Sequence, residues 1–323
     1  MHRRTLLAAT LALPAVARAQ SGTQSGAPLR LVVPFAPGGT SDILARLLQG
    51  PLAAELGQPV VVENRSGANG NLGAELVARA AGDGTALLLT DAGALATAPA
   101  LFPRLPFDAL RDLRPVQMLG YSPYLLVVNP AVPAADARAL EALARRSPDS
   151  INIATSGVGA ANHLVPLLLA KHWGVTLTTV PYRGGAAALT AVAGGEAQVL
   201  VNGAAATLPF ARDGRLRAVA TSRAGSRLPA LPDVPTFDEL GWPAGGSGTF
   251  QGILAPAATP PETVARLSAA LDRAHLADPV IARRYDQLAT ERSSMGPAAF
   301  AAWLAREAEQ WGRVVRENRI TAE

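Results

Sequence analysis

One short stretch near the N-terminus has residue types and spacing that suit the binding of an anion. Residues 33–46 read VPFAPGGTSDILAR, in which Phe35 ends an apolar run and Thr40 or Ser41 can cap a helix after the Pro-Gly-Gly turn. The first N–H groups of a helix have no partner inside it, and glycine lets a ligand approach the backbone closely. An anion at such a position gains about 0.3–1 kcal/mol from the helix dipole. The same string also fits an ordinary strand–turn–helix connection with Asp42 in the first turn, and local sequence leaves both interpretations open.

Residues that would support catalysis, a metal or a nucleotide cofactor do not occur at the required spacing. The chain contains no cysteine, and beyond the first 19 residues its histidines are His163, His172 and His275, none at metal-ligand spacing with carboxylates. The glycine-rich stretch 67–73 is not a G-x-G-x-x-G following a strand, and there is no G-x-S-x-G, P-loop or H-E-x-x-H string. We therefore expect no catalytic residue, no metal and no cofactor.

The charge pattern excludes one class of partner and offers one candidate residue. The formal net charge is +4, but removing Arg3, Arg4 and Arg18 leaves 26 basic residues against 25 acidic ones. The remaining arginines are scattered, so nucleic-acid binding has little support. Arg183, beside a Gly-Gly turn, can clamp a carboxylate through two hydrogen bonds or be a solvated loop arginine.

Short apolar runs alternate with helical patterns along most of the chain. The pattern predicts strands at 29–35, 59–64, 86–90, 124–128, 151–155, 176–180, 198–202, 216–221 and 249–256. Helices are predicted between them, the first of which, from Thr40, should break or kink near Gly50 because Pro51 follows. This βα order predicts parallel sheets with right-handed crossovers.

The alternation is interrupted in a way that indicates two lobes. Residues 223–248 are rich in Pro and Gly, and an all-helical tail follows the last strand. We expect the chain to cross between lobes near 119–122 and near 247–249. The predicted division is 20–121 with 249–323 as the first lobe and 122–248 as the second. Ligands of open α/β sheets bind beyond the carboxyl ends of the strands, which in two lobes can face one cleft.

Several longer motifs, in order along the chain, resemble those of the tripartite tricarboxylate transporter receptors, also called Bug-type solute-binding proteins. Besides 33–46 they are VVENRSGANGNLGAELVARAAGDGTAL (61–87), SGVGAANHL (156–164), VPYRGGAAALTAVAGGEAQ (180–198), GRLRAVATSRAGSRLPALPDVPTFDELG (214–241) and GILAPAATPPETVARL (252–267). The resemblance implies an α/β fold of the two-lobed type II periplasmic-binding-protein kind. Each lobe is expected to be a mostly parallel sheet flanked by helices, with two crossovers.

The resemblance also implies which residues bind the ligand. Its carboxylate should be held by backbone amides and ordered waters, carried over here to Gly38, Gly39 and Thr40. The opposite lobe should contribute Ser156, Gly157, Gly159 and Ala160. The same cleft should be lined by Tyr182, Arg183 and Gly184. The first-lobe side should be closed by Thr90 and Asp91. Asn202 is a further candidate. Two departures from the family stand out: Ala160 lacks a hydroxyl, and 198–202 reads QVLVN where the family usually reads DLMFD. The roles of Gln198 and Asn202 are therefore open.

Together these features predict a monomeric binding protein that captures a small carboxylate for an inner-membrane permease. A sensory receptor that presents the same ligand to a sensor kinase is an alternative that sequence cannot separate, and an exported hydrolase is a distant one. Because Gln198 and Asn202 carry no charge, we expect a ligand without an amino group, either a di- or tricarboxylate or an aromatic acid. Asp42 and Asp91 remain possible partners of a ligand ammonium group.

The first 19 residues have the features of a secretory signal. Arg3 and Arg4 precede an apolar stretch from Leu6 to Val16, and Ala17-Arg18-Ala19 has the small-x-small form of a cleavage site. We expect cleavage after Ala19 and release into the periplasm. With no cysteine to carry a lipid, the mature protein should diffuse freely.

Overall fold

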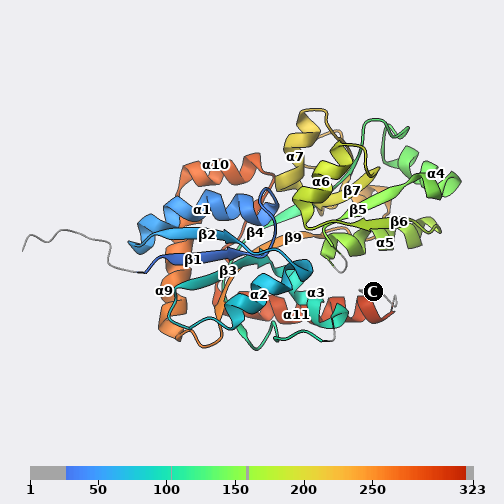
Figure 1. Cartoon of the computed structure of the whole chain (residues 1–323). Coiled ribbons are helices and arrows are strands. Elements are labelled where there is room, and N and C mark those ends of the chain that lie inside the picture. The colour runs from blue at the N-terminus through green and yellow to red at the C-terminus, as the bar shows by residue number, and fades with distance from the viewer. Residues whose placement is uncertain (1–26, 103, 158–159, 318–323) are drawn as a thin grey trace, which may run out of the picture.

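The computed structural model describes residues 27–102, 104–157 and 160–317. The predicted signal sequence and Gly159 lie outside the described residues. Figure 1 shows two α/β lobes side by side, one containing β1–β3 and the other β5–β7, with β4 and β9 running between them. No helix of the described chain is long and apolar enough to span a membrane.

The first lobe is built from the two ends of the chain. Its sheet contains β1, β2 and β3 in parallel, with β9 antiparallel to β3. Its elements are β1 (Leu29–Val33), α1 (Thr40–Leu56), β2 (Val60–Asn64), η1 (Ala68–Gly70), α2 (Asn71–Ala78), β3 (Ala86–Asp91), α3 (Ala92–Leu101), β9 (Gly248–Pro256), α9 (Pro261–Asp272), η3 (Arg273–Ala277), α10 (Pro279–Gln287), β10 (Glu291–Arg292) and α11 (Pro297–Glu317).

The second lobe repeats this plan with the middle of the chain. Strands β6, β5 and β7 are parallel, and β4 is antiparallel to both β7 and β8. Its elements are α4 (Ala137–Arg146), η2 (Pro148–Ser150), β5 (Asn152–Thr155), α5 (Ala161–Trp173), β6 (Thr178–Pro181), α6 (Gly185–Ala193), β7 (Val199–Gly203), α7 (Ala204–Arg212), β8 (Arg217–Thr221) and α8 (Phe237–Leu240).

The long strand β4 (Leu113–Val128) joins the lobes. It pairs antiparallel with β9 as far as Pro123↔Gly248, and with β7 from Tyr124↔Gly203 onward. The strand order is therefore β2-β1-β3-β9-β4-β7-β5-β6. Each sheet is mixed, because β9 runs antiparallel to β3 in the first lobe and β4 runs antiparallel to β7 in the second. The change of partner on β4 falls between Pro123 and Tyr124. The division of the chain at 121/122 and 248/249 stays a prediction.

Both faces of each sheet are covered, as expected for near-continuous apolar strands. Leu31 and Val33 of β1 contribute to the core under α1 and α9, whereas Val32 faces the core under α2 and α11. In the second lobe Leu125 and Leu126 alternate between two cores in the same way. This packing on both faces holds the strand ends, and the loops that follow them, in fixed positions.

The first helix was expected to break or kink near Gly50, and it does not break there. The helix continues to Leu56 with Pro51 inside it. An interior proline costs a helix about 3 kcal/mol or more, but Leu48 and Leu52, on either side of Pro51, are completely buried in the first-lobe core. Burial of two leucines offsets a cost of that size.

Candidate ligand-binding site between the lobes

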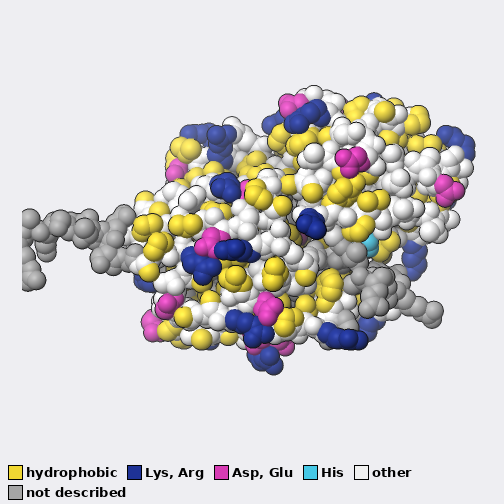
Figure 2. Space-filling model, viewed as in Figure 1, with side chains coloured by type: hydrophobic (Ala, Val, Ile, Leu, Met, Phe, Trp, Pro, Cys, Tyr) yellow, Lys and Arg dark blue, Asp and Glu magenta, His cyan; other side chains and the backbone are white. Residues whose placement is uncertain are grey.

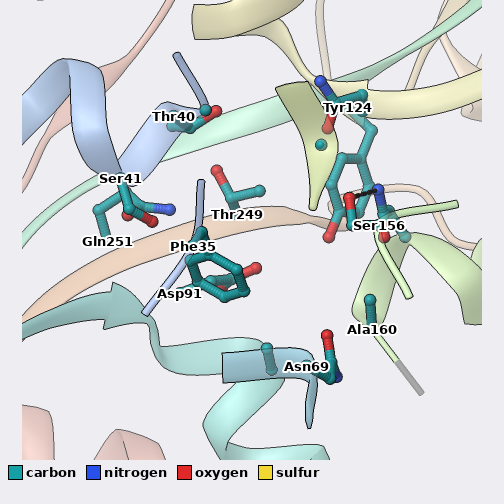
Figure 3. Close-up of a pocket in the computed structure, with 15 residues that line it drawn as sticks. Phe35, Thr40, Ser41, Asn69, Asp91, Tyr124, Ser156, Ala160, Thr249 and Gln251 are labelled. Carbon is teal, nitrogen blue, oxygen red and sulfur yellow. Dashed lines mark hydrogen bonds between the residues drawn. The ribbon is translucent and has the colours of Figure 1, made fainter. Parts of the chain in front are cut away.

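A cavity of about 50 Å³ lies where the two lobes meet, large enough for several water molecules or the polar end of a small ligand. Figure 3 shows its lining, with Thr40 and Ser41 at the start of α1 on one side and Ser156 and Ala160 beside α5 on the other. The described residues that line it are Phe35, Gly39, Thr40, Ser41, Asn69, Asp91, Ala94, Tyr124, Ser156, Ala160, Asn162, Gly185, Asn202, Thr249 and Gln251. Each lobe therefore supplies part of the wall.

The loop before α1 is held in shape by a carboxylate of its own. The amide of Gly38, which has φ +87°, donates to Asp42 Oδ2 at 2.9 Å, and Arg46 and Asn64 donate to the same carboxylate. Burial by itself raises the pKa of Asp42, but the hydrogen bonds from Arg46, Gly38 and Asn64 outweigh it and hold the pKa below its usual value. Asp42 is thus a structural anion that fixes the turn.

The start of α1 opens into the cavity one residue later. Gly39 is the N-cap of α1 with an ordinary extended backbone, φ −79°, and no side-chain hydrogen bond caps the helix there. Thr40 and Ser41 are both buried and line the cavity. The free N–H groups of this first turn therefore lie beside the cavity and favour negative charge there.

The wall from the second lobe consists of neutral polar groups. Asn162 Nδ2 donates to Ser156 Oγ at 2.7 Å and to the carbonyl of Val201, while Asn202 Nδ2 donates to Thr207 Oγ1 at 3.1 Å. Gly185 permits this crowding, since a Cβ there would lie 2.5 Å from Asn202 Oδ1. Gln198, by contrast, lies just before β7, and its Oε1 accepts a hydrogen bond from Asn152 N, which is a structural role.

Asp91 is the acidic group of the cavity wall. Its Oδ1 accepts hydrogen bonds from the amides of Gly93 and Phe250, at 3.0 and 3.1 Å. Burial raises the pKa of Asp91 to about 7, although these backbone donors act in the opposite direction. Burial also raises the pKa of Tyr124 well above its usual value, and the nearby Asp91 adds to that shift.

Several polar atoms that face the cavity have no partner among the described residues. They are Asn69 Oδ1 and Nδ2, Tyr124 Oη, Asn162 Oδ1, Thr249 Oγ1, and Gln251 Oε1 and Nε2. Buried polar groups in folded proteins are almost always hydrogen-bonded. Their concentration around one cavity indicates a place for a polar ligand or for ordered water.

A second, wider cavity of about 370 Å³ adjoins the first and shares Phe35, Asn69 and Ser156 with it. It is lined by the other candidates from the second lobe, Gly157, Tyr182, Arg183 and Gly184. Arg183 is exposed there and does not reach the inner cavity. A ligand longer than a few atoms could extend from the inner cavity into this space.

The structure thus brings together most, but not all, of the residues predicted from sequence. Gly39, Thr40, Asp91, Ser156, Ala160 and Asn202 line the inner cavity. Gly38 and Thr90 line neither cavity: the amide of Gly38 is bound by Asp42, and Thr90 is buried opposite Gly252 in the sheet.

Other lining residues were not predicted at all. These are Phe35, Ser41, Asn69, Ala94, Tyr124, Asn162, Gly185, Thr249 and Gln251. Three of them, Tyr124, Thr249 and Gln251, lie on the crossing strands β4 and β9. Their polar side chains interrupt apolar strands, and this feature could have identified them from sequence.

The lobes are in contact around the cavity. A Cβ added to Gly38 would lie 3.7 Å from Ala186 Cβ, and one added to Gly203 would lie 2.7 Å from Thr40 Oγ1. Because these pairs join the first lobe to the second, the cleft is closed over the inner cavity.

Two lobes joined by two antiparallel crossing strands, with a closed polar cavity between them, define a binding protein of the periplasmic type, and solved periplasmic proteins share the fold. The model of the tripartite tricarboxylate transporter family receptor matches residues 44–320. The chain belongs to this family, whose members are periplasmic solute-binding receptors.

Individual relatives span nearly the whole chain. Protein BugT of Bordetella pertussis is 34% identical over 297 residues, which cover 92% of this chain and 90% of the relative. The structure of MatC from Rhodopseudomonas palustris with bound malate is 34% identical, covers 89% of this chain and 98% of that one, and has a TM-score of 0.83. An R. palustris protein with adipate is 30% identical, covers 91% and 98%, and has a TM-score of 0.86.

Proposed function

We propose that this protein is a periplasmic receptor that encloses a small carboxylate between its lobes and delivers it, chemically unchanged, to an inner-membrane permease. One observation carries the proposal: the closed cavity joins the start of α1 to a ring of buried polar groups without partners. The malate and adipate in two similar structures support a carboxylate as the ligand class.

Neutral donors suit an anion that must be released again. The first-turn amides of α1 and the side-chain amides of Asn69 and Gln251 can each donate to a carboxylate without a buried cation. Among the described lining residues of the inner cavity there is no Lys, Arg or His, so binding there would not form a buried ion pair with them. The net gain from each neutral hydrogen bond is about 0.5–1.5 kcal/mol, which permits reversible capture.

Ser156, a hydroxyl group of the cavity wall, lacks the basic partner that a nucleophile needs. Ser156 Oγ accepts a hydrogen bond from the Asn162 amide, which is not a base. The nearest histidine in sequence, His163, contacts Thr155 Oγ1 at 3.4 Å and is not part of the lining. A nucleophile requires a base within hydrogen-bond reach, so we assign capture and release as the whole function.

The mature chain would act as a freely diffusing monomer in the periplasm, beginning at Gln20. Closure would report occupancy to the permease, since a ligand shifts the open–closed balance by its preference for the closed form. Gly38 would then act by shaping the loop before α1, and Thr90 by its place in the sheet. The residues of the outer cavity, Arg183 among them, would act at the entrance.

The test is mass spectrometry of the ligand that co-purifies with protein released gently from the periplasm. The proposal expects a carboxylate of a few carbon atoms that is recovered unchanged after prolonged incubation with the protein. A bound compound without a carboxylate, or steady conversion of the bound compound, would contradict it.

A further inference from the structure

Asp91 has an unusual environment for a carboxyl group that faces a binding cavity. It ends β3, caps the N-terminus of α3, and is only 8% exposed. Its Oδ1 accepts hydrogen bonds from the backbone amides of Gly93 and Phe250, and the amide of Ala94 also lowers its pKa. No salt bridge involving Asp91 is found in the described chain. A buried carboxylate without a cation is costly.

Among the described residues no charged side chain shifts the pKa of Asp91, on which only burial and backbone hydrogen bonds act. Phe250 and Gln251 on β9, Asn69 on η1 and Asn162 on α5 are neutral. On β4 the titratable neighbour is Tyr124, whose phenol remains protonated because burial raises its pKa.

Two titratable groups lie further out and do not change this picture. Burial lowers the pKa of His163 on α5, so its ring is uncharged at neutral pH. Burial raises the pKa of Glu307 on α11, which accepts from Trp311 Nε1 beside a neighbouring cavity lined by Gly93 and Tyr124. Neither group can balance a negative charge on Asp91.

A ligand carboxylate in this cavity would face a second negative charge if Asp91 were ionised. Two carboxylates that share a low-dielectric site cannot both remain charged, and one of them takes up a proton. A protonated Asp91 would gain a donor for the ligand and keep its other oxygen for the two backbone amides.

We propose that Asp91 is the specificity-determining residue of the receptor and that it shares one proton with the ligand, so that a carboxylate binds with uptake of a proton from solvent. This rests on the proposed function. An amino-acid ligand would instead place its ammonium beside an ionised Asp91, with no proton taken up. The protonation state of Asp91 therefore separates acids without an amino group from amino acids.

The pH dependence follows from the position of Asp91. Because burial raises the pKa of Asp91 to about 7 in the free protein, the group is already protonated below that pH and must gain a proton above it. Affinity for a carboxylate should be nearly constant between pH 5.5 and 6.5 and fall about tenfold for each pH unit above about 7.5. An ammonium ligand would show the opposite trend below pH 7.

The experiment is calorimetric titration of the full mature protein with succinate, malate and adipate at pH 6, 7, 8 and 9, in two buffers of different ionisation enthalpy. The wild type should take up close to one proton at pH 9 and almost none at pH 6. Asp91→Asn keeps a capping oxygen and adds a neutral donor, so it should bind with the same affinity at every pH, about 100-fold tighter than wild type at pH 9.

Asp136→Asn is the matched control, because Asp136 also caps a helix, α4, but is exposed in the second lobe away from the cavity. It should keep the wild-type pH profile. Carboxylate binding by the wild type at pH 9 without proton uptake would overturn the role of Asp91 alone. Loss of binding at every pH in an Asp91→Asn variant with an unchanged circular dichroism spectrum would do the same. Failure of all variants to bind any carboxylate would overturn the proposed function as well.

Discussion

Gly203 offers a way to disturb closure of the lobes without replacing any side chain that lines the cavity. It ends β7 in the second lobe, and a Cβ there would lie 2.7 Å from Thr40 Oγ1 and 3.3 Å from Thr249 in the first lobe. Its backbone has φ −56° and ψ 134°, which alanine adopts without strain. Gly203→Ala would therefore introduce a clash between the two lobes in the closed arrangement that the structure shows.

The size of the effect follows from those distances. Crowding of one extra methyl group into a packed interface costs about 1–3 kcal/mol, and each 1.4 kcal/mol is a tenfold change in affinity. Gly203→Ala should weaken carboxylate binding about 5- to 150-fold, either because the lobes stay apart or because Thr40 rotates away from the cavity. The free energy of unfolding without ligand should change by less than about 1 kcal/mol, since alanine restricts the unfolded chain but is a poorer helix cap than glycine.

Calorimetric titration and thermal unfolding would be measured together, with Gly50→Ala as the matched control. A Cβ at Gly50, inside α1, meets no atom within 4 Å, so that variant should be stabilised slightly and bind normally. Wild-type affinity in Gly203→Ala would refute the idea that these two walls close on the ligand.

Three other outcomes are expected. Gln251→Leu should weaken binding at least tenfold and leave the ligand-free protein at least as stable as wild type, because the side-chain amide of Gln251 has no partner among the described residues. The control Gln117→Leu should lower the melting temperature, because the Gln117 side chain is hydrogen-bonded to two other side chains. Equal losses of stability in the two variants would contradict this. Since burial raises the pKa of Glu307, the folded state binds its proton more tightly than the unfolded state and loses stability as pH rises past the usual carboxyl range. Glu307→Gln should thus unfold at a higher temperature than wild type at pH 7. If the gain in melting temperature over wild type were the same at pH 4 and pH 7, this explanation would be wrong. N-terminal sequencing of periplasmic extract should begin at Gln20, whereas a membrane-pelleting form that retains Met1 would exclude cleavage after Ala19.

The sequence was sufficient for the fold because its strong signals are local. Apolar runs of β-branched residues predicted all three parallel strands of each lobe, and the loop after β1 was recognised from its glycines. The first half of β4 was missed, since Pro115 and Gln117 interrupt its apolar pattern. Its strand conformation is imposed by pairing with β9, a segment more than 100 residues away.

The site was predictable only where binding depends on the backbone. Gly39 and Thr40 follow from the strand–turn–helix pattern, whereas Gln251 and Tyr124 reach the cavity because two crossing strands bring them there. Gly38 was wrongly expected to bind the ligand because the motif does not show where its amide points. In the folded loop this amide donates to Asp42, four residues along the chain, and is not available to a ligand.

The central claim is that the closed cavity holds a carboxylate without an amino group. Its most direct test is a thermal-shift comparison of succinate with aspartate, which differ only in the amino group, on the purified mature protein at pH 6. A ligand at about 100 times its dissociation constant adds about 2.7 kcal/mol of stability. The account predicts that succinate raises the melting temperature and aspartate does not. Greater stabilisation by aspartate would contradict it and make an ionised Asp91 the partner of the ligand ammonium.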